Sequence, residues 1–166
     1  MSFEVIFSHG KESGPAGVKI NALREICDDL GIKSNSIDYR GIEDPEIRAE
    51  KLVNVLNHNE MKVILVGSSM GAYVSLRACS HANVIGLFLM APAVLMPGYD
   101  NTDVDPHNLP TFIIHGWDDE IVPVENAIKF ANQYQKELLL VQDDHVLRHS
   151  LARLGSELRR FVSGFI

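Results

Sequence analysis

The sequence predicts an α/β fold in which one parallel sheet lies between two layers of helices. Short apolar segments alternate with longer amphipathic segments along the whole chain. A helix between two strands returns the chain to the same edge of the sheet, so consecutive strands run parallel. The continuous apolar run from Val84 to Met90 is typical of a strand buried on both faces. Because 166 residues are one domain's length, we expect a single three-layer sandwich over residues 1–166.

Six strands and five helices are expected. The strands are predicted at residues 3–8, 33–39, 62–66, 84–90, 111–114 and 137–141. Four helices are predicted at residues 18–30, 70–80, 123–135 and 146–163. The fifth begins at Pro45 with Asp44 as its N-cap, and its apolar face is formed by Ile47, Leu52, Val55 and Leu56. Residues 91–110 contain four prolines and no clear period, so they are expected to form a loop.

Composition excludes several classes of protein. The net charge of −7 argues against a nucleic-acid partner and against an anionic membrane surface. Two cysteines, Cys27 and Cys79, are too few for a disulfide framework or a zinc site, and both are expected to be small buried residues. We find neither a signal peptide nor an apolar run long enough for membrane insertion. We therefore expect a cytoplasmic protein, either a monomer or a homodimer.

The third predicted strand is followed by Gly67-Ser68-Ser69-Met70-Gly71, which matches the pattern G-x-S-x-G. By chance alone this pattern occurs in roughly one chain of this length in twenty. Its place between a strand and a helix is the context that a nucleophile elbow requires, since the strained turn there projects a serine hydroxyl above the sheet. Ser69, rather than Ser68, has the correct spacing to both glycines, so Ser69 is the candidate catalytic nucleophile.

The first predicted strand leads into a loop that starts with His9-Gly10-Lys11. Acyl transfer needs backbone N–H donors aimed at the oxygen that becomes negatively charged. One donor is expected from Met70, the residue after the nucleophile, and the second from this loop, with Lys11 as the candidate. His9 is a possible catalytic base, but a histidine here more often packs under the loop and hydrogen-bonds its backbone.

Three acidic residues, Asp118-Asp119-Glu120, follow the fifth predicted strand in the segment His115 to Pro123. A catalytic triad needs a carboxylate that holds the far side of the imidazole. We favour Asp119, because its position in His-Gly-x-x-Asp-x-x-Val-Pro places it above the sheet, and we keep Asp118 in reserve. The remaining acids are expected to be solvated or to cap the helix near Pro123.

The sixth predicted strand is followed by a short polar loop that contains His145. A general base belongs on such a loop, whereas His149 lies one helical turn further on and is expected to face outward or to pack. The candidate residues therefore occur in the order Ser69, Asp119, His145, which is nucleophile, acid, base.

On these motifs the chain resembles the α/β-hydrolase superfamily, and most of all its small esterase-type members without a lid. The resemblance implies Ser69 as nucleophile, Asp119 as acid and His145 as base, with the N–H groups of Lys11 and Met70 as the oxyanion hole. It also implies the strand order 2-1-3-4-5-6. The usual sheet has eight strands and a cap domain, whereas here we count six strands, and only residues 91–110 occupy the place of the cap.

These observations predict a serine hydrolase that cleaves a small carboxylic ester through an acyl-enzyme on Ser69. The partner is a small acyl substrate, and no metal or organic cofactor is needed. A thioesterase or an amide hydrolase would use the same residues, and a non-catalytic binding module of the same fold is the alternative from another class. Near the site, Met70, Leu95 and Met96 are candidates either for an acyl pocket or for the core.

Overall fold

The computed structural model describes residues 2–166 and contains the expected alternation of strands and helices. The strands are β1 (Phe3–Ser8), β2 (Lys33–Ile37), β3 (Lys62–Ser68), β4 (Val84–Met90), β5 (Thr111–Gly116) and β6 (Glu137–Val141). The helices are α1 (Val18–Asp29), α2 (Pro45–Asn57), α3 (Met70–Ala78), α4 (Val124–Tyr134) and α5 (Leu151–Ser163), with a short 3-10 turn, η1 (Arg148–Ser150), before α5.

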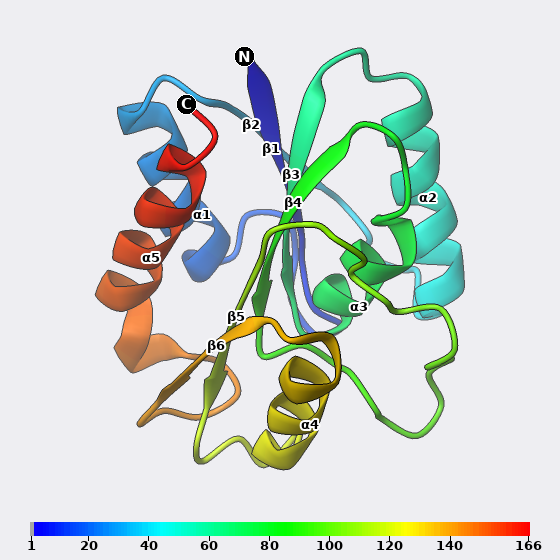
Figure 1. Ribbon diagram of the computed structural model, residues 1–166, viewed down its shortest axis with the longest axis vertical. Coiled ribbons are helices and arrows are strands. Elements are labelled where there is room, and N and C mark those ends of the chain that lie inside the picture. Colours follow the sequence, from blue (N-terminus) through cyan, green and yellow to red (C-terminus); the bar gives the residue numbers. More distant parts are fainter. Residues whose placement is uncertain (1) are drawn as a thin grey trace.

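All six strands form one parallel sheet in the order β2-β1-β3-β4-β5-β6, so the predicted strand order is confirmed. Figure 1 shows this sheet nearly edge-on, with α1 and α5 on one side and α2, α3 and α4 on the other. Because the strands are parallel, all their carboxyl ends lie at one edge of the sheet, where functional sites of such folds are usually found.

Two hydrophobic clusters cover the two faces of the sheet. Phe7, Phe88 and Phe112 belong to the cluster under α1 and α5, whereas Leu65 and Leu89 belong to the cluster under α2, α3 and α4. Alternate strand residues point to opposite faces, so each central strand contributes to both clusters. Both cysteines are free and buried, as the composition indicated.

The element ends differ from the predicted ends in several places, and two of these bear on the site. Strands β3 and β5 continue to Ser68 and Gly116, because Ser68 pairs with Met90 and Gly116 pairs with Val141. The last helix begins at Leu151, not at residue 146, because Leu147 has a left-handed backbone conformation with φ 58° and breaks any helix there. The loop after β6 is therefore longer than predicted.

The packing of α2 also corrects the sequence analysis. Ile47 was expected on the buried face, but its side chain is 50% exposed. The neighbouring Arg48 is instead 2% exposed, and it packs inward together with Ala49, Leu52 and Leu56. A charged side chain thus lies beside Leu52 and Leu56 on the buried face of α2, where the sequence predicts apolar residues only.

Residues 91–110 form a loop without helix or strand and are tied to two helices. The hydroxyl of Tyr73 on α3 donates to the carbonyl oxygen of Asp100 at 2.9 Å. On α4, Asn126 Nδ2 donates to the carbonyl oxygen of Val94 at 3.0 Å. The fold therefore lacks the cap domain of larger α/β hydrolases, as expected, and this anchored loop occupies its place.

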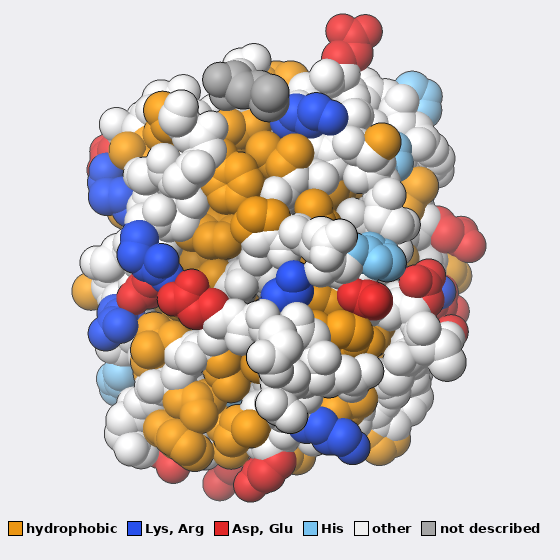
Figure 2. Space-filling model, viewed as in Figure 1, with side chains coloured by type: hydrophobic (Ala, Val, Ile, Leu, Met, Phe, Trp, Pro, Cys, Tyr) orange, Lys and Arg blue, Asp and Glu red, His pale blue; other side chains and the backbone are white. Residues whose placement is uncertain are grey.

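The surface carries charges of both signs. Figure 2 shows Lys, Arg, Asp and Glu side chains scattered among hydrophobic ones on the face in view, without a large region of one sign. Within residues 2–166, no helix has the length and hydropathy that a membrane span requires.

Candidate active site

Ser69 occupies the sharp turn between β3 and α3. Its backbone has φ 54° and ψ −116°, a strained conformation for a residue other than glycine. The glycines on both sides make the turn possible by close approach. A Cβ on Gly71 would lie 2.0 Å from the carbonyl oxygen of Ser8, and one on Gly67 would lie 2.4 Å from the carbonyl oxygen of Gly71. No side chain fits in either place, so the G-x-S-x-G spacing follows from backbone packing.

The structure brings the three residues predicted as a triad into one hydrogen-bonded chain. His145 Nε2 lies 2.9 Å from Ser69 Oγ, and His145 Nδ1 lies 2.7 Å from Asp119 Oδ2. These side chains come from the ends of β3, β5 and β6, which are separated by up to 76 residues in sequence. The imidazole side chain is 20% exposed, whereas the Asp119 carboxylate is fully buried. Solvent and substrate can therefore reach the histidine but not the acid.

Four donors surround the Asp119 carboxylate. Its Oδ1 accepts hydrogen bonds from the backbone N–H groups of Ile121 at 2.9 Å and Val122 at 2.8 Å. Its Oδ2 lies 2.7 Å from His145 Nδ1 and 3.1 Å from His115 Nε2. Burial alone would raise the pKa of Asp119, but the hydrogen bonds from the two histidines and from Val122 outweigh it and hold the pKa below its usual value. The acid is therefore ionised at neutral pH.

The alternative acids and the alternative histidine lie outside this chain of contacts. Asp118 is exposed and accepts a hydrogen bond from the side chain of Gln142 at 2.5 Å. Glu120 is exposed as well. His149 lies on the exposed 3-10 turn before α5. Of these candidate acids and histidines, Asp119 and His145 are the ones that form the chain of hydrogen bonds to Ser69.

His9 is fully buried beneath the loop after β1 and makes two backbone contacts. Its Nδ1 donates to the carbonyl oxygen of Gly10 at 2.7 Å, and its Nε2 accepts from the N–H of Tyr39 at 2.9 Å. Burial lowers the pKa of His9, so the ring is neutral at neutral pH. Both ring nitrogens are occupied, which leaves His9 bracing the loop and not acting as a base.

The loop after β1 lies directly beside Ser69. A Cβ on Gly10 would be 3.5 Å from the Cβ of Ser69. Within residues 2–166, the backbone N–H groups of Lys11 and Met70 donate to no carbonyl or side chain. Both N–H groups are thus free for a ligand, and the side chain of Lys11 is exposed.

The apolar residues near the site mostly belong to the core. Met70 is buried in the cluster under α2, α3 and α4, and Leu95 and Met96 pack against that cluster while half-buried. Only Leu95 and Met96 therefore keep surface that a ligand can touch.

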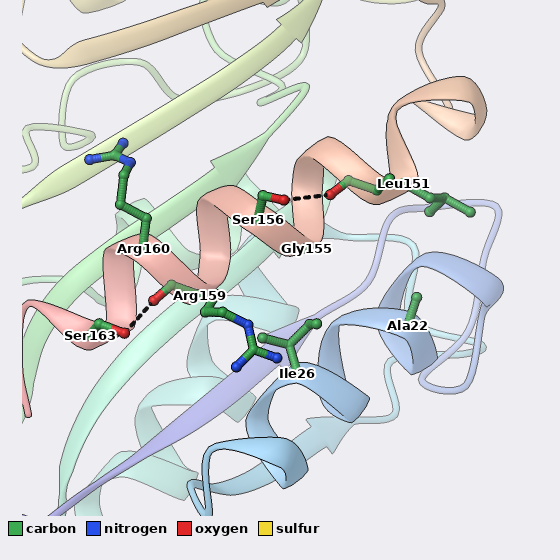
Figure 3. Close-up of a pocket in the computed structure, with 9 residues that line it drawn as sticks. Ala22, Ile26, Leu151, Gly155, Ser156, Arg159, Arg160 and Ser163 are labelled. Atoms are coloured by element: carbon green, nitrogen blue, oxygen red, sulfur yellow. Dashed lines mark hydrogen bonds between the residues drawn. The ribbon is translucent and has the colours of Figure 1, made fainter.

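A groove of about 580 Å³ lies elsewhere, between α1 and α5, and includes none of the triad candidates. Figure 3 shows that small residues such as Ala22 and Gly155 line it, together with Arg159 and Arg160 of α5. The candidate site at the strand ends is thus separate from this groove.

A six-stranded parallel sheet with a serine elbow and no cap defines the chain as an α/β hydrolase without a lid. A family model described as serine hydrolase matches residues 31–151, which is more than half of the chain. The chain therefore belongs to the serine hydrolase family. A search of curated proteins finds no match.

Solved structures support the same class. The chain is similar to a hydrolase of the α/β superfamily from Xanthomonas campestris, with 28% identity, 99% of each chain covered and a TM-score of 0.90. A serine hydrolase without lid from the same organism has 21% identity, coverage of 100% of this chain and 84% of that chain, and a TM-score of 0.80. Est1E from Butyrivibrio proteoclasticus, in its structure with ferulic acid, has 18% identity, coverage of 98% and 88%, and a TM-score of 0.86. The last two likenesses concern the fold alone.

Proposed function

We propose that this serine hydrolase cleaves small carboxylic esters through an acyl-enzyme on Ser69. The observation that supports this most directly is the chain of contacts from Ser69 Oγ to His145 Nε2 and from His145 Nδ1 to Asp119 Oδ2. A buried, ionised acid fixes the tautomer of a histidine, and that histidine contacts the hydroxyl of a serine on a strained turn. This arrangement generates an oxygen nucleophile without any other group.

Acylation begins when Ser69 Oγ attacks the ester carbonyl carbon and His145 Nε2 takes the hydroxyl proton. The carbonyl oxygen becomes negatively charged and accepts hydrogen bonds from the N–H groups of Met70 and Lys11. As the tetrahedral intermediate collapses, the bond to the leaving oxygen breaks and His145 returns its proton to that oxygen. Asp119 stabilises the imidazolium throughout and stays ionised.

Deacylation repeats these steps with water. His145 takes a proton from a water molecule, whose oxygen attacks the acyl carbon on Ser69 Oγ. The intermediate then collapses, and the proton returns to Ser69. The partly exposed imidazole gives water direct access to the base. The products are a carboxylic acid and an alcohol.

A small ester suits the open site better than an amide does. Residues 91–110 form a loop tied down on α3 and α4, and within residues 2–166 this segment contains no helix or strand that could grip a large substrate. An ester carbonyl is also more electrophilic than an amide carbonyl, and an alkoxide is a better leaving group than the anion of an amine, so an ester demands less of a shallow site. A thioester meets the same conditions, and substrates of the three kinds with graded acyl length would separate them.

The test is the pair of variants Ser69→Ala and Asp119→Asn, assayed on p-nitrophenyl acetate. We expect kcat to fall about 10⁵-fold or more for Ser69→Ala and about 10⁴-fold for Asp119→Asn. Asp118→Asn is the matched control, since it removes the adjacent exposed carboxylate, and it should keep kcat within about threefold. Ester hydrolysis that survives in Ser69→Ala would refute the mechanism. If a fluorophosphonate leaves folded wild-type protein unlabelled, the binding-module alternative is correct.

A further inference from the structure

Arg48 on α2 is a buried cation beneath the loop that follows β1. Its guanidinium donates through Nη1 to the carbonyl oxygens of Gly10 at 3.1 Å and His9 at 3.3 Å. Its Nε donates to the carbonyl oxygen of Ile42 at 2.6 Å, and its Cζ lies 5.4 Å from the centre of the Tyr39 ring. The side chain thus joins the start of α2 to the loop beside the nucleophile.

This arginine lacks the partner that buried cations usually have. Within residues 2–166, Arg48 forms no salt bridge, whereas the less buried Arg77 pairs with the Glu46 carboxylate at 2.8 Å. Removing a charge from water costs several kcal/mol unless other groups solvate it. Here backbone carbonyls and one aromatic ring do so, and two of the three carbonyls belong to the His9-Gly10 segment.

The hydrogen bonds to the carbonyl oxygen of Gly10 also orient the N–H group of Lys11, which belongs to the same peptide. The carbonyl oxygen of Gly10 accepts from both Arg48 Nη1 and His9 Nδ1, at 3.1 and 2.7 Å. In a trans peptide the C=O and N–H bonds point in opposite directions. A carbonyl held toward the buried guanidinium therefore turns the N–H of Lys11 away from the interior. This peptide lies beside Ser69, since a Cβ on Gly10 would be 3.5 Å from the Ser69 Cβ.

We propose that Arg48 is a positioning residue that holds the Gly10–Lys11 peptide with its N–H aimed at the oxyanion formed on Ser69. The inference rests on the proposed function, because it gives the Lys11 N–H its role there. A donor fixed before the reaction costs no reorganisation when charge develops, which is the main source of oxyanion stabilisation. A charged donor on the carbonyl also polarises the peptide and strengthens the hydrogen bond from its N–H.

The experiment compares wild-type protein with Arg48→Met and Arg48→Lys. Active sites are counted by end-point fluorophosphonate labelling, so that any unfolded fraction does not enter kcat. We expect Arg48→Met to lower kcat about 10- to 100-fold, with KM changed less than about threefold. The Ki of a trifluoromethyl ketone, which forms an oxyanion on the serine, should rise by a similar factor of about 10 to 100. Arg48→Lys keeps the positive charge and one donor nitrogen, so its kcat and its Ki should lie between those of wild-type protein and Arg48→Met.

Glu4→Gln is the matched control. Glu4 is a buried charged residue at the opposite end of β1, where it pairs with Lys33 at 3.2 Å. This variant should lose stability without a change in kcat or Ki, which separates positioning from mere support of the fold. If wild-type protein is neither labelled nor active, the proposed function fails and this inference fails with it. If wild-type protein is labelled and active, but the Arg48 variants keep kcat and Ki within about threefold, only the inference is wrong.

Discussion

The dipeptide His-Gly occurs at the carboxyl ends of two strands, as His9-Gly10 directly after β1 and as His115-Gly116 at the end of β5, and the two copies have different surroundings. His9 and His115 are both fully buried. Both nitrogens of His9 contact the backbone, at Gly10 and Tyr39. His115 Nε2 lies 2.9 Å from the carbonyl oxygen of Val122 and 3.1 Å from Asp119 Oδ2, while His115 Nδ1 has no hydrogen-bond partner within residues 2–166.

The comparison shows that the neighbouring loop decides what a buried histidine does. After β1 the loop carries no carboxylate near the ring, so His9 only braces backbone. After β5 the loop returns Asp119 to the ring, so His115 contributes to the group of donors around the acid. The same dipeptide at two strand ends therefore supports different parts of the candidate site, the loop beside Ser69 in one case and Asp119 in the other.

The largest expected difference concerns the two glycines of these dipeptides. A Cβ on Gly116 would lie 2.2 Å from the carbonyl oxygen of Asp143, which is backbone and cannot move aside cheaply. A Cβ on Gly10 would meet nothing closer than 3.5 Å. We expect Gly116→Ala to cost about 3 kcal/mol of unfolding free energy and to lower kcat about 100-fold, because the displaced segment carries His145.

The same measurements on Gly10→Ala provide the control for this prediction. Urea unfolding should show a change of less than about 1 kcal/mol, since the site has room for a methyl group and its backbone is not left-handed. Equal losses of unfolding free energy in Gly116→Ala and Gly10→Ala would mean that the steric difference between the two strand ends has no effect in solution.

A smaller effect should distinguish the two histidines. We expect His115→Phe and Asp119→Asn to be coupled by about 1 to 2 kcal/mol in a double-mutant cycle of unfolding free energies, because the two side chains lie in contact. His9→Phe combined with Asp119→Asn should be additive within about 0.5 kcal/mol, because no contact joins these residues. Additive behaviour of the His115 pair would show that His115 does not support the acid.

The smallest expected effect is the pH dependence that His9 causes. Burial lowers the pKa of His9, so the unfolded chain binds a proton more readily than the folded protein does. The stability that this contributes is fully present above pH of about 6.5 and is lost as the pH falls below it. The free energy of unfolding should therefore fall less for His9→Gln than for wild-type protein when the pH is lowered from about 7.5 to about 5.5. His58→Gln, which removes an exposed histidine at the end of α2, is the matched control.

Much of the fold was predictable from sequence because the signals are local. Loop segments clearly separate the alternating strands and helices. The segment Gly67 to Gly71 encodes a turn that requires glycine on both sides of Ser69. The positions of Asp119 and His145 followed from the rule that functional side chains come after strand ends. The strand order came from the resemblance to α/β hydrolases, and periodicity alone would not have supplied it.

The rest depends on contacts between distant segments. Hydrophobic periodicity placed Ile47 inside, but the buried residue is Arg48, whose acceptors lie up to 39 residues away in the chain. Nothing in the local sequence marks that arginine. Similarly, the segment from residue 146 has a helical pattern, but Leu147 takes a left-handed conformation that lets its side chain reach the core. Tertiary packing overrides local preference at both places.

The contact of Gly71 with the end of β1 also has a practical consequence for anyone redesigning this enzyme. The backbone at Gly71 touches the carbonyl groups of Ser8 and His9 so closely that a single methyl group would separate them. Ser8, His9 and residues 67–71 therefore pack as one rigid unit, which a mutational library should leave untouched. Diversity aimed at new substrates belongs at the exposed positions of residues 91–110 and at the exposed side chains of Trp117 and Ile121.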